Sequence, residues 1–224
     1  MSKVTYVDHM GSDLSVVNAA RVSFAKTSEW MSIPEAGPTV GLLTEQDEKI
    51  INYLAKHNHW SPFGHASLQI HVKAPVFVAR QLVKHQVGLV WNEVSRRYVD
   101  HEVEFHMPDA WRGRADDKKQ GSSEEEIDIN PRHSMVDDYE QVCQKAKWTY
   151  EHLLRQGVCP EQARMVLPQS MMTEWYWSGT LMAFARVCNL RCKPDTQLET
   201  QMVANQIDEI GNDLFSYSWG ALRK

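Results

Sequence analysis

Hydrophobic and polar residues alternate most regularly in the middle of the chain, in the segment SLQIHVK at residues 67–73. Leu68, Ile70 and Val72 occupy one set of alternate positions and polar residues occupy the other, which predicts a half-buried strand. Residues 99–109 (VDHEVEFHMPD) alternate in the same way. The opening segment VTYVDHMGSD combines a short β-prone run with a Gly-Ser-Asp turn. The pattern therefore predicts two or three strands.

Helical spacing of hydrophobic residues prevails in the rest of the chain. Asp13 can cap a helix that runs through LSVVNAARVSF, and Thr44 with Asp47 resembles a capping box that opens a second helix. Pro75 suits the first turn of a third helix. Further helices are predicted at 135–156, at EQARMVL after Pro160, from Thr173-Glu174 through Phe184, and from about Pro194 to Phe215.

This order of helices, strands and further helices predicts an α+β fold that forms one domain over residues 1–224. Residues 28–43 contain two prolines and two glycines and predict a loop. Residues 112–134 are polar and charged and lack a sustained apolar pattern, so we expect an exposed loop there.

Composition narrows the classes of function. The net charge of −5 argues against general binding to nucleic acid, so any basic site is local. No run approaches the roughly 18 apolar residues of a membrane helix, and the N-terminus lacks a signal-peptide pattern. We therefore expect a cytoplasmic protein without a membrane partner. Four cysteines with neither CxxC spacing nor a disulfide framework predict reduced thiols: Cys143, Cys159, Cys188 and Cys192.

Residues 80–98 (RQLVKHQVGLVWNEVSRRY) concentrate cationic, amide and hydroxyl side chains in a short stretch. On a helical wheel drawn from Pro75, Arg80, Gln81, Lys84 and His85 share one arc, opposite an apolar side. A helix with such a basic front suits a small polyanionic ligand, and a solvated surface face is the ordinary alternative.

Other chemistries are less well supported. His57, His59 and His65 lie in one turn, but no carboxylate or cysteine accompanies them at usable spacing, so we assign no metal site. Cys159 could be a nucleophile, but the sequence supplies no activating base, and an inert thiol is preferred. The sequence has no GxGxxG or GxxxxGK[ST] motif, so neither common phosphate-loop nucleotide fold is indicated.

Three arginines are better candidates for ligand binding. Arg97, Arg164 and Arg191 each lie at the edge of an otherwise apolar helical segment, where each could form a structural ion pair. Together with Lys84 and the hydroxyl of Ser95, they could instead clamp a phosphate and a planar acidic base. Guanidinium groups suit both tasks because they offer paired donors.

Separated blocks of the sequence resemble the flavin-dependent thymidylate synthase family, in the family's order along nearly the whole chain. MGSDLSVVNAARVSFAK resembles its N-terminal segment, and HWSPFGHASLQIHVKAPVFVARQ resembles its His-x-Ser/Thr-Pro-Phe-x-His turn, strand and Arg-Gln helix. NEVSRRY matches the Ser-x-Arg-Tyr ending, and KKQGS, PEQARMVLP and NLR match further blocks. The resemblance implies a small central antiparallel sheet flanked by helices, with long C-terminal helices.

The resemblance also implies an activity. In that family NADPH reduces FAD, methylenetetrahydrofolate supplies one carbon, and dUMP is methylated at C5 to give dTMP without attack by an enzyme cysteine. The family forms homotetramers whose active sites lie between subunits. We therefore expect FAD, NADPH and methylenetetrahydrofolate as cofactors, dUMP and the folate as small-molecule substrates, and a homotetramer.

The family's roles transfer to matching positions of this chain. Arg191 would stabilise negative charge at N3 of the uracil, because a fixed cation favours the deprotonated ring. Ser95 would lie near the phosphate, and Arg191 and Ser95 are the expected catalytic residues. The residues expected to bind the substrate are Gln81, Lys84, Glu93, Ser95, Arg96, Arg97, Arg164 and Arg191. The residues expected to bind the cofactor are His59, Ser61, Lys84, His85, Gln86, Glu93 and Arg186.

The chain departs from the family pattern on the flavin side. The signature Arg-His-Arg, seven residues and Ser is here Lys84-His85-Gln86 with eight residues before Ser95. Lysine keeps the charge but loses the paired donors, and glutamine has no charge. The family's Asn-x-Arg-Ser segment and a later Asn fall, by register, on Thr180, Met182 and Arg186. Arg186 could restore the positive charge near the flavin phosphates.

Three functions remain open at this point. The first is thymidylate synthesis. The second keeps the scaffold but changes the pyrimidine, for instance to dCMP, or the group added at C5. The third is a non-catalytic nucleotide-binding relative that has lost its flavin, which would bind dUMP without oxidising NADPH.

Overall fold

The computed structural model of the chain describes residues 1–31, 41–99, 102–115, 121–127 and 135–223. Its centre is a sheet in the order β1-β2-β6-β3, in which all neighbouring strands are antiparallel. The strands are β1 (Lys3–Met10), β2 (Ser67–Pro75), β3 (Leu89–Glu93) and β6 (Met172–Thr180). The α+β class and the strands expected at the N-terminus and at residues 67–73 are confirmed.

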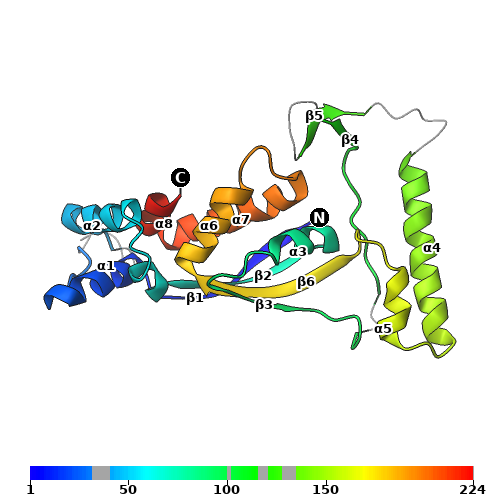
Figure 1. Ribbon diagram of the computed structural model, residues 1–224, viewed down its shortest axis with the longest axis horizontal. Coiled ribbons are helices and arrows are strands. Elements are labelled where there is room, and N and C mark those ends of the chain that lie inside the picture. Colours follow the sequence, from blue (N-terminus) through cyan, green and yellow to red (C-terminus); the bar gives the residue numbers. More distant parts are fainter. Residues whose placement is uncertain (32–40, 100–101, 116–120, 128–134, 224) are drawn as a thin grey trace.

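Helices cover one face of this sheet, as Figure 1 shows. They are α3 (Val76–Leu82), α6 (Leu181–Arg191) and α7 (Leu198–Leu214), while α8 (Ser216–Leu222) packs against other helices at the end of this layer. Leu68, Ile70 and Val72 of β2 are buried in the core under these helices, as the alternating pattern predicts. Trp175 and Trp177 of β6 are buried beside them, so the two central strands supply the middle of the core.

The opposite face of the sheet carries polar cross-strand pairs. Gln69 Nε2 donates a hydrogen bond to Ser178 Oγ at 2.9 Å. His71 lies opposite Tyr176 in the pairing of β2 with β6, and the two ring centroids are 5.2 Å apart. Such pairs stabilise a sheet without burying it in a core.

Two helices lie at one end of the sheet in Figure 1: α1 (Asp13–Arg21), which a short 3₁₀ turn η1 (Val22–Phe24) extends, and α2 (Glu45–Lys56). Both were predicted, but the cap of α1 is Ser12, not Asp13. Asp13 is buried, and its carboxylate accepts the backbone N–H groups of Tyr217 at 3.2 Å and Ser218 at 2.8 Å. An anion is stabilised at a helix N-terminus, so Asp13 caps α8 instead.

The other end of the molecule in Figure 1 holds three elements: α4 (Met135–Arg155), α5 (Pro160–Ala163) and the 3₁₀ turn η3 (Arg164–Val166). They pack around a second, small core whose buried members are Val103, Tyr150 and Ala163. The helices predicted at 135–156 and after Pro160 are confirmed. The assignment of residues 1–224 to one domain stays a prediction.

Strand β6 overturns the helix predicted from Thr173-Glu174 through Phe184. All nine residues of Met172–Thr180 pair with β2. The aromatic run Trp175–Trp177 favours a strand, because large flat side chains pack well on a pleated surface. Helix α6 begins only after Thr180, whose Oγ1 accepts the N–H of Ala183 at 3.3 Å.

The second strand, expected at residues 99–109, is also wrong. Within the described part of that segment, one isolated bridge joins Phe105 to Met171, and residues 100–101 lie outside the description. The alternating pattern is present, but the described part of the segment forms backbone–backbone hydrogen bonds only with residues 170–172. Alternation alone therefore does not make a strand, because a strand also needs a neighbouring strand that accepts and donates its ladder hydrogen bonds.

The exposed loop expected over residues 112–134 contains regular structure. Two strands, β4 (Arg112–Arg114) and β5 (Ser122–Glu126), pair with each other, while 116–120 and 128–134 lie outside the described residues. In the loop expected at 28–43, Met31 bridges to Leu42, and residues 32–40 are likewise outside the description.

The helix after Pro75 is confirmed but ends at Leu82, so the basic arc drawn from Arg80 to His85 does not lie on one helix. The chain then turns and forms β3, which the hydrophobic pattern did not reveal. The last long helix is confirmed as α7, although it begins at Leu198. None of the helices in the described ranges is both long and apolar enough to cross a membrane.

Asp47 connects the start of α2 to α1, and we expect Asp47→Ala to lower the free energy of unfolding by about 3 kcal/mol. The side chain is 1% exposed, and its oxygens accept hydrogen bonds from Arg21 Nη2 at 2.6 Å, Ser28 Oγ at 2.8 Å and Thr44 Oγ1 at 2.8 Å. Removing it leaves a largely buried guanidinium without its partner. Urea denaturation measures the loss.

The control is Glu45→Ala in the same helix. Glu45 pairs with Lys49 in solvent, with 82% of its side chain exposed, so its removal should change the unfolding free energy by less than about 0.5 kcal/mol. Equal losses in the two variants would show that the junction of α1 and α2 does not depend on Asp47.

Candidate functional site

The expected cofactor segment Lys84-His85-Gln86 follows α3 and is turned back toward the sheet at Gly88. Gly88 has a φ of +79°, which favours glycine, and Leu89 N–H donates to the Gln86 carbonyl at 3.2 Å. Gly179 of β6 permits this approach, because a Cβ there would lie 2.3 Å from the Gly88 carbonyl oxygen. The two glycines therefore hold the segment against the start of α6.

A pocket of about 420 Å³, here called the His85 pocket, lies between this segment and α6. Lys84, His85 and Gln86 line one side, and Arg186 and Asn189 of α6 line the other. The fold thus brings four of the expected cofactor residues together: Lys84, His85, Gln86 and Arg186. Two of them carry positive charge, so the pocket suits an anionic group.

Arg191 is joined to this pocket by a hydrogen bond from its Nε to Nε2 of His85 at 3.0 Å. Burial lowers the pKa of His85, and the positive charges of Arg191 and Arg186 lower it further. A neutral imidazole can accept through Nε2, whereas a protonated one cannot. Within the described residues the Nη groups of Arg191 bond to no side chain, so His85 orients a guanidinium whose outer donors face away from it.

Glu93 at the end of β3 has both carboxylate oxygens held. Thr173 Oγ1 donates to Oε1 at 2.8 Å, and Trp91 Nε1 donates to Oε2 at 3.2 Å. Thr173 is buried and belongs to β6. The orientation of this expected substrate residue is therefore fixed by the sheet.

The next residues form a β-turn in which the Tyr98 N–H donates to the Ser95 carbonyl at 3.0 Å. Arg97 is exposed, and its Nε donates to Ser95 Oγ at 3.2 Å. These two expected substrate residues lie together on the surface. Arg96, between them, is instead buried, with 7% of its surface exposed.

The remaining expected substrate residues lie elsewhere. The amide oxygen of Gln81 is buried and has no donor among the described residues, which points to an additional donor such as a ligand or water. Arg164 is exposed in η3, and its Nε donates to the Glu161 carbonyl at 3.4 Å. Because η3 follows α5, Arg164 belongs to the end of the molecule opposite α1 and α2.

His59 and Ser61 line a different and larger pocket between α1 and α2, of about 1030 Å³. Three aromatic side chains that also line it are exposed: Phe24, Tyr53 and Trp60. Lys26 and Lys49 add positive charge. Exposed aromatic rings beside cations suit a planar ligand with phosphate groups, and this pocket is here called the α1–α2 pocket.

The α1–α2 pocket and the His85 pocket share no lining residue. The residues expected to bind one cofactor are therefore divided between two surfaces of a single chain. Sequence reasoning missed the aromatic lining of the α1–α2 pocket and the role of Thr173. The sequence could not show that aromatic residues near His59 are exposed, because aromatic residues are more often buried. It also could not show that Thr173 lies beside Glu93, because the two are far apart along the chain.

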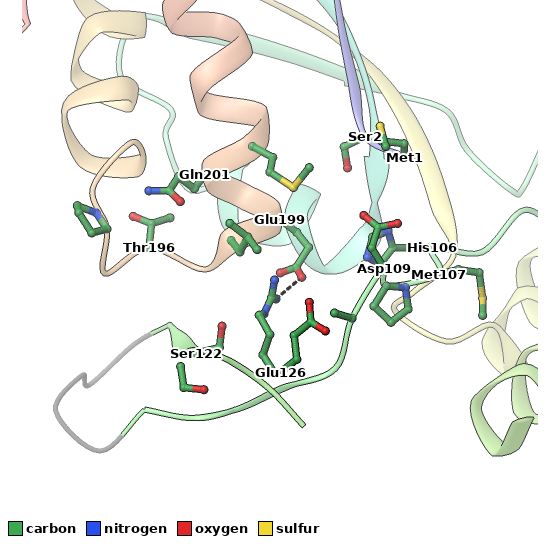
Figure 2. A pocket seen from close by; sticks show the side chains of 17 residues that line it. Met1, Ser2, His106, Met107, Asp109, Ser122, Glu126, Thr196, Glu199 and Gln201 are labelled. Carbon is green, nitrogen blue, oxygen red and sulfur yellow. Dashed lines mark hydrogen bonds and ion pairs between the residues drawn. The ribbon is translucent and has the colours of Figure 1, made fainter. Parts of the chain in front are cut away.

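A third pocket, of about 520 Å³, lies beside β4, β5 and the start of α7 (Figure 2). Arg112 forms an ion pair with Glu199 across it, and His106, Asp109 and Glu126 also line it. None of the expected site residues lies in its lining. Its balance of acidic groups does not suit a nucleotide phosphate, so it is separate from the candidate site.

The cysteines and histidines give no alternative centre in the described part of the chain. No group of three or more His, Cys, Asp or Glu side chains is arranged there to hold a metal ion. All four cysteines are free thiols, and Cys159 is the exposed one at the start of α5.

We expect Arg191→Gln to raise the pKa of His85 toward its ordinary value of about 6.5, because the variant removes a positive charge beside the ring. An NMR titration of the imidazole measures the shift. Since the folded-state pKa is lowered, the stability that neutral His85 contributes is complete above the unfolded pKa. This contribution to stability declines as the pH falls from the unfolded-state pKa toward the lower folded-state pKa.

The control for this titration is Arg155→Gln, at the far end of α4. It removes the same charge away from the His85 pocket and should leave the pKa of His85 unchanged. An unchanged pKa in Arg191→Gln as well would show that Arg191 and His85 are not neighbours in solution.

Comparison with known proteins places this chain in a family. The family model described as thymidylate synthase complementing protein matches residues 5–215. A flavin-dependent thymidylate synthase of Thermus thermophilus is 37% identical over 221 residues, which cover 99% of this chain and 75% of that relative. Another, of Kosmotoga olearia, is 37% identical over 209 residues, covering 92% and 84%.

The fold has a solved counterpart in the UMP/dUMP methylase PolB from Streptomyces cacaoi bound with 5-Br dUMP. The TM-score is 0.79 at 30% identity, covering 99% of this chain and 94% of that one. A structure of the same methylase bound with 5-Br UMP gives a TM-score of 0.78. The resemblance carried by the separated sequence blocks is confirmed, and the chain belongs to the flavin-dependent thymidylate synthase family.

Proposed function

We propose that this chain methylates dUMP at C5 to give dTMP, with methylenetetrahydrofolate as carbon donor and FAD reduced by NADPH. Membership of the family supports a flavin-dependent methyltransferase. The observation that carries the proposal within this chain is the bond from Arg191 Nε to His85 Nε2, at 3.0 Å. It holds a partly buried, permanent cation beside a cationic pocket.

Arg191 would act on the uracil ring. Methylation at C5 requires that carbon to become electron-rich, and negative charge at N3 and on the neighbouring carbonyl oxygens makes it so. A guanidinium held at that edge stabilises this charge. His85 serves as the acceptor that fixes the guanidinium, and its lowered pKa keeps it neutral near pH 7.

Ser95 and Arg97 would hold the phosphate of dUMP. Their side chains are joined on one turn, where Ser95 is half-buried and Arg97 is exposed, and a hydroxyl with a guanidinium is a strong donor set for a phosphate. Glu93 and the buried amide of Gln81 would bind the nucleoside part. Lys84 and Arg164 complete the set that we propose for the nucleotide.

His59 and Ser61 would hold part of the flavin in the α1–α2 pocket, and Lys84, His85, Gln86 and Arg186 would hold another part in the His85 pocket. When bound, FAD supplies hydride chemistry between NADPH and the one-carbon unit. The protein's own contribution is to place an anionic planar group between aromatic rings and cations, and to exclude water around it.

A homotetramer would join these separated surfaces. Because the two pockets share no lining residue, one chain alone offers only a partial cofactor site. Arg164 lies at the other end of the molecule from the α1–α2 pocket. Association of several copies would let one chain's α1–α2 pocket complete the His85 pocket of another.

A second candidate is methylation of UMP. It is favoured by the likeness in fold to a methylase whose structures hold 5-Br dUMP and 5-Br UMP. The dCMP alternative has no such structural support, and Arg191 would need a different task there, because cytosine has no N3 proton to lose. The non-catalytic alternative predicts nucleotide binding without NADPH oxidation.

One experiment separates these functions. The absorption spectrum of the purified protein reports bound flavin, and anaerobic addition of NADPH, with and without dUMP, reports its reduction. Turnover is then compared for dUMP, UMP and dCMP with methylenetetrahydrofolate present. A colourless protein that takes up no flavin would overturn the proposed function, and turnover of UMP alone would select the second candidate.

We expect Arg191→Ala to leave folding and bound flavin largely intact and to lower turnover by at least about a hundredfold, because an electrostatic contact made to developing charge is worth roughly 3 kcal/mol. Circular dichroism, the flavin spectrum and steady-state kinetics measure the three properties. The matched control is Arg155→Ala on α4, which should keep full turnover. Unchanged rates in Arg191→Ala would contradict the role assigned to it.

We expect Gln86→Arg to be tolerated and Arg186→Gln to weaken flavin binding by about tenfold or more. Both residues line the His85 pocket, so an added cation at 86 suits an anionic group, and removal of the cation at 186 does not. The flavin dissociation constant of the apoprotein measures both effects. Loss of flavin in Gln86→Arg would argue against an anionic ligand in this pocket.

The double variant Gln86→Arg/Arg186→Gln tests whether the two positions are interchangeable. If the pocket needs one cation beside Lys84 from either element, the double variant should bind flavin about as well as the wild type. Binding no better than Arg186→Gln alone would show that the position of the charge matters more than its presence.

A further inference from the structure

Two neighbouring arginines of the Ser95–Tyr98 turn face opposite surroundings. Arg96 is 7% exposed, whereas Arg97 is exposed. The turn is closed by the bond from Tyr98 N–H to the Ser95 carbonyl, at 3.0 Å, so both arginines occupy its central positions. The two arginines therefore meet different partners, although they are adjacent and of the same type.

Arg96 points into the protein. Its Nη2 donates to the Glu102 carbonyl at 3.2 Å, and its side chain lines a small cavity of about 100 Å³ with Lys73, Glu104 and Glu174. A guanidinium with little exposure persists only where acceptors and opposite charges compensate its lost hydration. The contacts of Arg96 are therefore those of a residue that holds its own chain in place.

The charges around that cavity depend on Arg96. Three carboxylates line it: Glu102, Glu104 and Glu174. Lys73 Nζ lies 2.7 Å from Glu104 and 3.8 Å from Glu174, and Lys147 Nζ lies 2.5 Å from Glu102. His71 Nε2 also lies 3.2 Å from Glu174. Arg96 lines the same cavity, so its removal takes a permanent positive charge from beside these carboxylates. Mutual repulsion of the carboxylates would then loosen the segment.

Arg97 has the opposite arrangement. Its backbone N–H and its Nε both donate to Ser95 Oγ, at 3.3 Å and 3.2 Å, and its guanidinium carbon lies 5.0 Å from the centre of the Tyr98 ring. Its Nη groups make no hydrogen bond within the described residues. The donors of Ser95 and Arg97 therefore converge on solvent, where a ligand can reach them.

We propose that Arg96 is a positioning residue, which does not contact the nucleotide but anchors the turn so that Ser95 and Arg97 are held ready for the phosphate. The proposal rests on the proposed function for the identity of that ligand. The start of the same segment is already fixed, because Val94 N–H donates to the Glu174 carbonyl at 2.9 Å and Glu93 is bonded to Thr173. Arg96 supplies the second anchor, after which Arg97 faces outward.

The test begins without any ligand. Amide hydrogen exchange of residues 94–99 is compared in wild type, Arg96→Gln, Arg96→Lys and the control Arg155→Gln, which makes the same substitution at an exposed arginine of α4. We expect exchange to rise about tenfold or more in Arg96→Gln, to rise less in Arg96→Lys, which restores the charge, and to stay unchanged in Arg155→Gln. Melting temperatures identify any variant that unfolds globally, and Arg96→Lys then carries the comparison.

The second arm measures dUMP affinity in a double-mutant cycle. We expect each of Arg96→Gln and Arg97→Gln to weaken binding by about tenfold or more. The double variant should bind no worse than Arg97→Gln alone, because Arg96 acts through the residue that is already missing. Restored affinity in Arg96→Lys, in step with restored protection from exchange, would support the same conclusion.

Two results would overturn the proposal: unchanged exchange in a folded Arg96→Gln variant, or fully additive losses of affinity, which would make Arg96 a direct contact. If the wild-type protein binds no dUMP, the proposed function fails. The exchange data then still decide whether Arg96 holds the turn, so the two failures are distinguishable.

Discussion

Strand β6 supports each part of the candidate site that the described residues bring together. Thr173 fixes the carboxylate of Glu93, and the carbonyl of Glu174 holds the start of the Ser95 turn. Gly179 admits the turn at Gly88, and the residue after it caps helix α6, which carries Arg186 and Arg191. One strand therefore sets the relative positions of Glu93, the Ser95 turn and the His85 pocket.

The stiffness of β6 comes from its aromatic residues. Trp175 stacks on Trp91 of β3 with ring centroids 4.3 Å apart, and Trp177 packs edge-on against Phe184 at the start of α6. Both tryptophans of β6 are fully buried. Densely packed rings leave little freedom to the backbone between them. Polar residues near them in the strand, such as Thr173, are therefore held in place to make their hydrogen bonds to other elements.

Sequence reasoning predicted the residue types of the site better than their arrangement. Most helices and the strand β2 followed from periodicity, because their hydrophobic faces are regular. Strand β6 did not, since a threonine followed by apolar residues also fits a capped helix. The difference between Arg96 and Arg97 was equally hidden, because it depends on the register of the turn against β6. The division of the expected cofactor residues between two pockets depends on tertiary contacts that no local pattern encodes.

The lining of the His85 pocket can exchange one cationic residue for another and still attract an anionic ligand. Long-range attraction to an anion depends on the number and distance of nearby cations, and not on which element supplies them. A cation missing at Gln86, on the turn after α3, can therefore be offset by Arg186, on α6, since both line the same pocket. Hydrogen bonds are directional, however, and a lysine at position 84 offers no paired donors. We therefore expect this chain to differ from the family signature in how it orients an anionic group, while it keeps the attraction for one.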